Sequence, residues 1–442
     1  MFDQKLKTIL EKSISWLSAN IDHYSSCPEK DFSRVRKLPP EKLIPHLLSQ
    51  GSSSSVNELL DFFCLSANTP TLSALNQQRN KLKPEAFQTL FMYFNASIEA
   101  LNRHSSDYRF IAVDGSTFSF FSKPSFHSFE YFVEPGHSMK GFYSVHVNAF
   151  YDLETQTYTN ALTQPVHQKD EFGAFCTMVD MTKALPDTKY VFIGDRGYCS
   201  YNNMAHTIEK GQYFLFRTKD IHSKGLVKNF DRPNDASFDM DVTVTIVRSH
   251  SKKVVVQKGY TRFIDANSSF DFVAYGSHET YEMTFRVVRF LITETTYECM
   301  VTNLPRDEFP AERLKELYNA RWGVESSFRQ LKYTIGLSHF HSYKPKFVLQ
   351  EIWAKLLSYN VTALLINHTK IEETDTKHTY KVSFSVAAHV AKTFLRSLFK
   401  DLVIDVFAIL KCHLMPIREG RKFERLKTAH FRRPKYFIYR PS

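Results

Sequence analysis

The chain of 442 residues carries 57 Lys and Arg against 46 Asp and Glu, a formal net charge of +11. It is longer than one ordinary domain, and its hydrophobic content of 43% is enough for several buried cores. No apolar run approaches the roughly 18 residues of a membrane span, so the sequence excludes an integral helical membrane protein, and its basic balance favours a polyanionic partner.

The six cysteines are scattered along the chain, and none forms a CxxC pair or a sequence cluster with histidine. This distribution is typical of reduced thiols, and we expect no structural zinc site. The N-terminus, Met1 to Lys5, has no signal-peptide pattern. These features predict a cytoplasmic protein without a membrane partner.

Residues 1–105 are predicted to be helical, because apolar side chains recur at helical spacing in two stretches, 6–17 and 56–65. An Ala-Asn-Thr-Pro break follows, with Thr69 as the expected N-cap of the next helix. That helix carries Arg79 among polar side chains expected on accessible faces. The pattern predicts either a DNA-binding helix-turn-helix with Arg79 as a contact, or a plain helical bundle with a polar surface.

Strand-like apolar runs alternate with helical patterns from residue 106 to 217, which predicts an α/β core. The polar cluster of His167, Asp170 and Glu171 is interpreted as a loop leading into a capped helix, and His146 has no partner at metal-ligand spacing. The predicted strands cover residues 109–113, 144–151, 157–163, 189–194 and 212–217, and the predicted helices cover residues 170–183 and 200–210.

Two isolated aspartates follow strand-like runs in this region. Asp114 comes after Phe-Ile-Ala-Val and begins an Asp-Gly-Ser-Thr sequence, and Asp195 comes after Val-Phe-Ile-Gly. Each run is interpreted as a buried strand that ends at the carboxylate and enters a Gly-containing turn. Functional sites in open α/β sheets gather at the carboxyl ends of strands, so the two aspartates are candidate site residues.

From residue 218 to 304 the pattern is predicted to be all-β, with alternating apolar residues. A helix is then predicted over 310–333, and further helical segments follow. The predicted strands cover residues 241–247, 253–257, 284–292 and 297–302, and the later helical segments cover residues 347–367 and 383–411.

The helix predicted over 310–333 has an organised polar face. On an ideal helix Arg321, Glu325 and Lys332 lie within roughly 60° of Tyr318. Trp322 lies beside this face, and Arg329 joins it. An amphipathic helix would place aliphatic residues on its organised face, whereas this set suits a phosphate backbone with a metal ion among the phosphates. The alternative is a solvated charged face with pairing along the helix.

Residues 411–442 contain ten Lys and Arg against two acids, a net charge of +8. Aromatic and His side chains, among them His430, Phe431, Tyr436, Phe437 and Tyr439, are interleaved with these charges. The combination fits phosphate contacts with base or sugar stacking, and the alternative is a solvated basic tail.

The two aspartate motifs and the Tyr-x2-Arg-x3-Glu-x6-Lys spacing occur in this order along the chain. Together they resemble the DDE transposases of bacterial insertion sequences, and more narrowly the IS-four family with its Tyr-Arg-Glu-Lys signature. The resemblance implies an α/β, ribonuclease H-like catalytic core interrupted by an all-β insertion, with flanking helical regions. The implied divisions are a helical DNA-binding domain (1–105), the first part of the core (106–217), the β insertion (218–304), the second part of the core (305–370) and a helical, basic C-terminal region (371–442).

The resemblance implies that Asp114, Asp195 and Glu325 are the catalytic residues and the ligands of two Mg²⁺ ions, with Mn²⁺ as a substitute. Phosphodiester hydrolysis requires an activated water and stabilisation of a charged transition state, which two such ions supply. Three clustered carboxylates repel one another, so cations are needed to keep all of them ionised.

The implied activity is cut-and-paste DNA transposition. The implied partners are the terminal inverted repeats, the target DNA and a second copy of the chain in the DNA complex, in a cytoplasmic, nucleoid-associated location. The implied DNA contacts are Tyr318, Arg321, Lys332 and Arg329, with Trp322 either stacking on DNA or packing in the core. Relatives that form a DNA hairpin use an aromatic residue of the insertion. This insertion contains no Trp, and Tyr297 is the expected substitute.

Two other interpretations remain. The first is a non-catalytic DNA-binding protein derived from a transposase, which would have no use for three converging carboxylates. The second is a glycosidase with an acid pair, and the basic tail does not suit a neutral sugar.

Overall fold

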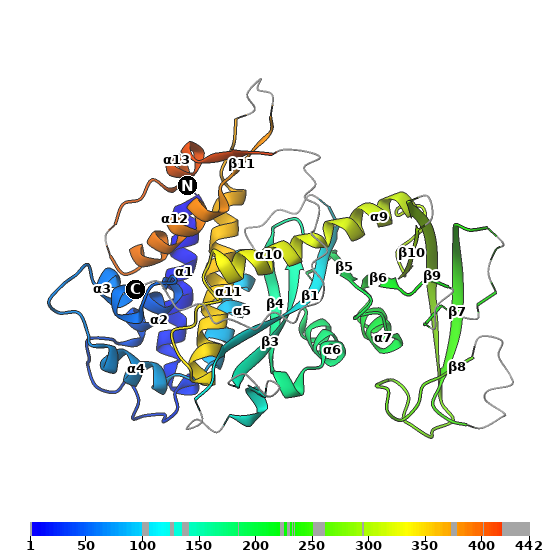
Figure 1. Cartoon of the computed structure of the whole chain (residues 1–442), viewed down its shortest axis with the longest axis horizontal. Helices are drawn as coiled ribbons and strands as arrows, with labels where there is room; N and C mark the ends of the chain where they lie inside the picture. Colours follow the sequence, from blue (N-terminus) through cyan, green and yellow to red (C-terminus); the bar gives the residue numbers. More distant parts are fainter. Residues whose placement is uncertain are drawn as a thin grey trace.

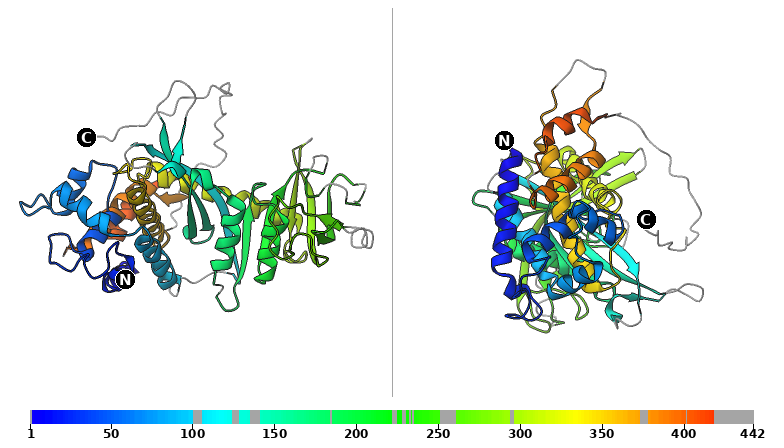
Figure 2. Two further views of the ribbon diagram at one scale, coloured as in Figure 1. Left: turned by 90° about the horizontal axis from the view of Figure 1, so that it is seen from below. Right: turned by 90° about the vertical axis from the view of Figure 1, so that its left-hand side faces the viewer.

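A computed structural model gives the fold of the chain. It describes residues 2–99, 106–123, 128–134, 141–183, 185–221, 225–227, 230–231, 233, 235–250, 261–293, 296–372, 378–400 and 402–417. The predicted strand at 253–257 and the basic segment from residue 418 onward lie outside these ranges. Helices gather at one end of the molecule, and the strands of the β-rich segment lie at the other (Figures 1 and 2).

The N-terminal helices form a bundle with the C-terminal ones. Its centre is α11 (Pro345–Asn367), whose side chains are buried almost all round between Phe347 and Leu365. A helix that is apolar on every face requires a cover of other helices. That cover comes from α1 (Phe2–Ala19), α2 (Pro40–Leu48), α3 (Ser55–Phe62), α4 (Leu72–Lys81), α5 (Glu85–Glu99), α12 (Phe384–Ser397) and α13 (Val406–Cys412).

Two predictions for α4 are wrong. Thr71 is its N-cap, because the hydroxyl oxygen accepts a hydrogen bond from the Ala74 N–H, while Thr69 binds the carbonyl of Ser66. Arg79 does not lie on an accessible face: it is 1% exposed and forms an ion pair with Glu351 of α11. The guanidinium is buried because α4 packs its C-terminal half against the central helix.

A single mixed sheet contains nearly all the strands. Its order is β2-β3-β1-β5-β6-β10-β9-β7-β8, and β4 pairs with β3 on the same edge as β2, beyond the two residues that β2 covers. The strands are β1 (Tyr108–Phe121), β2 (Phe132–Val133), β3 (Phe142–Asp152), β4 (Thr157–Pro165), β5 (Lys189–Gly194), β6 (Tyr213–Thr218), β7 (Phe238–Val247), β8 (Thr261–Phe263), β9 (Thr280–Thr293) and β10 (Thr296–Thr302).

The predicted α/β class is confirmed, with one difference in the β-rich segment. Within β1–β6, β1 is antiparallel to β3 and parallel to β5, and β5 is parallel to β6. The strands after residue 218 extend this same sheet, because β10 pairs antiparallel with β6. They do not form a sheet of their own.

Helices cover both faces of the sheet. On one face α6 (Glu171–Met181) and α7 (Tyr201–Glu209) pack through a cluster that includes Phe175 and Met204. On the other face α9 (Ala311–Ala320) and α10 (Trp322–Tyr333) run nearly in line across the strands towards α11 (Figure 1). The remaining short elements are the 3-10 helices Ile21–Tyr24, Phe129–Tyr131 and Val166–Gln168, and a two-stranded sheet of β11 (Tyr380–Val382) and β12 (Leu414–Pro416).

The helix predicted over 310–333 is divided at Arg321. There the Arg321 N–H binds the carbonyl of Tyr318 and the Val324 N–H binds the carbonyl of Arg321, so the chain tightens to three-residue spacing. The predicted helix over 383–411 is likewise two helices, α12 and α13. Among the described residues, no helix combines the length and apolarity that crossing a bilayer requires.

Candidate active site where β1 and β5 separate

Asp114 lies within β1, and the prediction that the strand ends there is wrong. Antiparallel pairing with β3 continues to Phe121, which keeps the strand extended. The parallel pairing with β5, however, ends at Ala112 opposite Ile193. Asp114 is therefore the first residue of its face beyond the point where β1 and β5 separate. Its Oδ1 accepts a hydrogen bond of 2.9 Å from the Gly115 N–H.

Asp195 directly follows β5 and begins a tight turn. Its Oδ1 accepts a hydrogen bond of 2.8 Å from the Gly197 N–H, a common turn-forming contact of aspartate. A Cβ on Gly197 would lie 3.1 Å from this same oxygen. The glycine thus keeps one side of the carboxylate open, and the prediction that the Asp195 strand ends at the carboxylate is confirmed.

Glu325 comes from the first turn of α10, on the sheet face that Asp114 also faces. Its Oε1 lies 2.9 Å from Nη2 of Arg321, one helical turn earlier. Arg321 is buried, and its guanidinium carbon lies 5.4 Å from the Tyr318 ring centroid and 5.6 Å from that of Trp322. The two rings and the ion pair fix the arginine, which in turn fixes the orientation of Glu325.

The electrostatics of Asp114 connect the three carboxylates. Burial is the main cause that raises the pKa of Asp114 to about 6, and the negative charges of Glu325 and Asp195 contribute to this rise. The Gly115 N–H and the Arg321 guanidinium act in the opposite direction. Asp195 and Glu325 therefore act on Asp114 where β1 and β5 separate. A cation bound there would favour the ionised form of Asp114.

An open pocket of about 560 Å³ lies between β1 and α10, beside Asp114 and Glu325. Trp322 lies on the wall of this pocket and is 49% exposed. The alternative in which this side chain packs in the core is therefore wrong. The Lys332 ammonium, 4.9 Å from the Phe118 ring centroid, is also on the wall. The lining residues are Asp114, Ser116, Trp322, Glu325, Ser326, Phe328, Arg329, Lys332 and Tyr333.

Two other predicted DNA contacts lie away from the pocket. Tyr318 is only 4% exposed and packs in the apolar cluster under α9, so it reaches the site only through Arg321. Tyr297 lies on the face of the sheet that α6 and α7 cover, paired across the strands with Leu291. Its ring is covered by the Arg289 guanidinium at 3.8 Å from the centroid.

Sequence reasoning missed a fourth carboxylate beside the aspartates. Glu171, the first residue of α6, lies with its Oε1 3.0 Å from Nε2 of the buried His146. The His146 ring and then the Lys169 ammonium lower the pKa of Glu171 to about 2, against the effect of burial. A Cβ on Gly115 would lie 3.0 Å from Glu171 Oε1, so the pair lies beside Gly115, the residue that follows Asp114 in β1.

The register between β1 and β3 is the feature that brings His146 next to this part of β1. Thr117 of β1 lies opposite His146 of β3, and the Thr117 hydroxyl is 3.0 Å from the His146 Nδ1. The interpretation of the preceding segment as a loop into a capped helix is confirmed, because Asp170 caps α6 through a 2.9 Å hydrogen bond from the Gly173 N–H.

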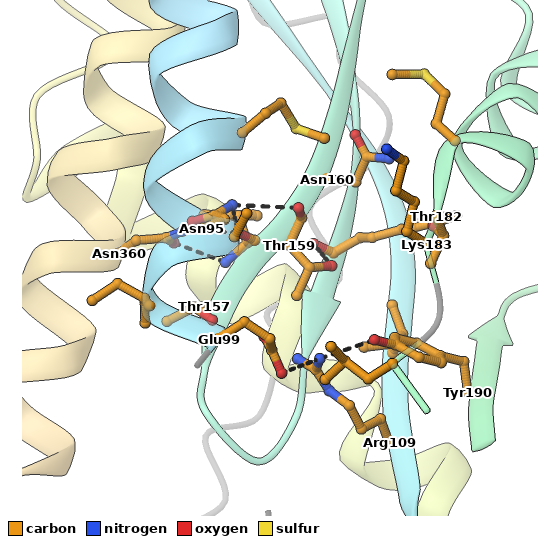
Figure 3. Close-up of a pocket in the computed structure, with 18 of the residues that line it drawn as sticks. Asn95, Glu99, Arg109, Thr157, Thr159, Asn160, Thr182, Lys183, Tyr190 and Asn360 are labelled. Atoms are coloured by element: carbon orange, nitrogen blue, oxygen red, sulfur yellow. Dashed lines mark hydrogen bonds and ion pairs between the residues drawn. The ribbon is translucent and has the colours of Figure 1, made fainter. Parts of the chain in front are cut away.

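A second pocket, of about 410 Å³, lies between α5 and β4 and contains none of the three carboxylates (Figure 3). Its main charges pair with one another, since Arg109 bridges Glu99 at 2.7 Å and Asp152 at 2.6 Å. Asn360 donates to Asn95, which itself binds the backbone of β4. This pocket is a seam between the bundle and the sheet with mainly apolar walls, and it contains none of the three carboxylates.

Comparison with known proteins gives short matches to curated transposases. The chain is 28% identical over 130 residues to the transposase InsG for insertion sequence element IS4 of Escherichia coli K12, covering 27% of this chain and 28% of InsG. It is 34% identical over 59 residues to the transposase for insertion sequence element IS421 of Escherichia coli, covering 13% of this chain and 16% of that protein. The matched segments thus span less than a third of either relative.

Comparison with solved structures finds a piggyBac transposase synaptic complex with hairpin DNA, with a TM-score of 0.46 and 9% identity over 92% of this chain and 81% of that one. The family comparison covers much more of the sequence than the curated relatives do. The model of the transposase DDE domain matches residues 105–361, well over half of the chain, and this range contains all three carboxylates. The chain belongs to the family of proteins with a transposase DDE domain.

Proposed function

We propose that this protein is a cut-and-paste DNA transposase of the IS-four type, in which Asp114, Asp195 and Glu325 hold two Mg²⁺ ions for phosphodiester hydrolysis and strand transfer. The observation that carries the proposal is that Glu325 of α10 and Asp195, directly after β5, both raise the pKa of Asp114 in β1, although the three residues are far apart in the sequence. Family membership supports the reaction class.

The residues present fit hard divalent cations. The set offers carboxylate oxygens only, which Mg²⁺ and Mn²⁺ prefer, and the raised pKa of Asp114 is what uncompensated negative charge in a buried site produces. When bound, such ions activate a water and stabilise the attacking and leaving oxygens of the phosphate. The strand order β4-β3-β1-β5-β6, with β1 antiparallel to β3, supports a ribonuclease H-like core.

The protein's own residues supply orientation and binding. Arg321 holds Glu325 in place, and the site of the guanidinium between two rings keeps it from swinging away. Lys332 and Arg329 offer positive charge to phosphates from the pocket wall, and the exposed face of Trp322 offers a stacking surface for a base or sugar. The Glu171–His146 pair lies beside Gly115 and would support this part of β1 next to Asp114.

The proposed partners are the ends of an insertion sequence, the target DNA and a second copy of the chain in the DNA complex. The test is to incubate the full chain with DNA that carries the ends flanking its own coding sequence. We expect cleavage at the ends and joining to a target plasmid with Mg²⁺, and neither with EDTA. DNA binding without cleavage at any Mg²⁺ or Mn²⁺ concentration would instead establish the non-catalytic alternative.

A further inference from the structure

A second cluster of ligand-type side chains lies on the other face of the sheet, between α6, α7 and the loop that follows β8. Cys176 comes from α6, His206 from α7 and Asp271 from the loop, and their Sγ, ring nitrogen and carboxylate atoms all lie within 4.8 Å of one another. The sequence itself contains no His/Cys cluster, and this group forms only in the fold. The three residues are far apart in the chain, and only the packing of α6 against α7 brings them together.

The side chains of this cluster are held by their neighbours. Nε2 of His206 lies 2.8 Å from Asp271 Oδ2, while its Nδ1 lies 3.1 Å from Asp180 Oδ1. Asn202 donates to Asp271 Oδ2 at 2.8 Å and accepts from the Asp271 N–H at 2.9 Å, which fixes the loop. The Cys176 thiol donates to Asn203 at 3.3 Å. An open pocket of about 610 Å³ borders the cluster.

We propose that Cys176, His206 and Asp271 form a binding site for a zinc-class divalent cation, separate from the acid triad. One thiolate, one imidazole and one carboxylate suit Zn²⁺, whereas Mg²⁺ and Ca²⁺ prefer oxygen ligands alone. Asp180 takes the position of the carboxylate that orients a metal-binding histidine through its other ring nitrogen. The adjoining pocket leaves a fourth position open to water.

Proton release is part of this binding. In the metal-free protein the Cys176 thiol donates its proton to Asn203. A dication would bind the thiolate and displace this proton, so affinity should rise with pH.

The site would have a structural consequence. A cation there joins α6 and α7 to the loop of residues 264–279, which precedes β9. The first residue of α6 is Glu171, which lies beside Gly115, the residue that follows Asp114. Binding would therefore stabilise the layer that supports the proposed active site without entering that site.

The competing explanation needs no metal. His206 lies between two carboxylates, so a protonated ring could serve both as an ion-pair bridge. That arrangement would leave Cys176 a buried thiol with no ligand role. The two explanations differ in whether sulfur coordinates an added cation.

The test uses Co²⁺ as a spectroscopic stand-in for Zn²⁺ on the full chain, followed by Zn²⁺ titration against a chromophoric chelator. We expect one Zn²⁺ per chain and a thiolate-to-cobalt charge-transfer band that Zn²⁺ removes. Cys176→Ser should abolish the band. His206→Gln and Asp271→Asn should weaken metal binding. Asp180→Asn should weaken metal binding roughly 10- to 100-fold.

The matched control is Cys199→Ser, a partly buried cysteine close to the start of α7, which should leave the band intact. Asp114→Asn should also leave it intact, so loss of transposition and loss of this site remain distinguishable. A missing band, or a band unchanged in both Cys176→Ser and Asp271→Asn, would overturn the proposal and leave His206 as an ion-pair bridge.

Discussion

Asp114 binds its proton more tightly in the folded protein than in the unfolded chain, because burial and two neighbouring carboxylates raise its pKa to about 6. A pKa that is higher in the folded protein than in the unfolded chain makes the folding stability fall as the pH rises. The stabilising contribution is complete below the unfolded pKa and is lost as the pH rises through about 6. At neutral pH and without metal, the site therefore costs folding free energy, as functional sites commonly do.

Asp114→Asn should remove this cost. At pH 8 without divalent metal, we expect the variant to exceed the wild type in free energy of unfolding by up to about 3 kcal/mol, with no gain at pH 4. Urea denaturation at the two pH values measures the difference. Mg²⁺ should stabilise the wild type and not the variant, and the exposed control Asp307→Asn should have no effect at either pH. An equal gain at both pH values would contradict the electrostatic origin.

Glu171 provides a second test at the residue scale. As a positioning residue it should affect catalysis more than DNA binding, so Glu171→Gln is expected to reduce cleavage at least about 10-fold and to raise the Mg²⁺ concentration for half-maximal rate. Lys169→Ala, which removes the other partner of the same carboxylate, is the control and should stay near wild type. A variant with unchanged Mg²⁺ dependence would reduce Glu171 to the packing of α6.

Elements with strong local patterns could be predicted from the sequence. The strand at 189–194 has the predicted bounds, since a continuous apolar run between a turn and a glycine permits little else. β1 extends beyond its prediction because the cross-strand partner that prolongs it, β3, is distant in the sequence. The joining of β10 to β6, the Glu171–His146 pair and the Cys176 cluster equally depend on long-range pairing, which no local pattern contains.

The contact between α4 and α11 gives a prediction at the element scale. Arg79 binds Glu351, Gln350 and the Phe347 carbonyl, so Arg79→Ala removes the guanidinium from the buried Glu351 and leaves this carboxylate its contacts with His341. We expect a loss of about 3–5 kcal/mol in the free energy of unfolding. Asn76→Ala, at an exposed position on the same helix, should cost far less. Lower DNA affinity with unchanged stability would restore the surface role that sequence reasoning gave to Arg79.

The whole molecule places the proposed site between the helical bundle and the β-rich end, where α10 crosses the sheet (Figure 1). Most of the positive excess, however, is carried by residues 411–442. If that segment contacts DNA, each neutralised phosphate releases counterions and steepens the salt dependence of binding. The distribution of charge therefore predicts an effect on the affinity for DNA, not on the cleavage reaction.

Deleting residues 418–442 should weaken DNA binding and flatten the plot of log affinity against log salt. The change in slope is expected to correspond to several phosphate contacts, because the deleted segment carries most of the local Lys and Arg. Fluorescence anisotropy across a salt series measures it. Equal slope and affinity before and after the deletion would make the segment a solvated appendage.

The convergence of Asp114, Asp195 and Glu325 on one metal-dependent reaction is the centre of the account. Its most direct test is single-turnover cleavage of DNA that carries the flanking ends, measured with Mg²⁺ for Asp114→Asn, Asp195→Asn and Glu325→Gln, with a gel-shift assay on the same DNA. The account predicts that each variant loses cleavage to background while DNA binding persists, because the phosphate contacts lie elsewhere. Cleavage near the wild-type rate in any one of the three variants would contradict it.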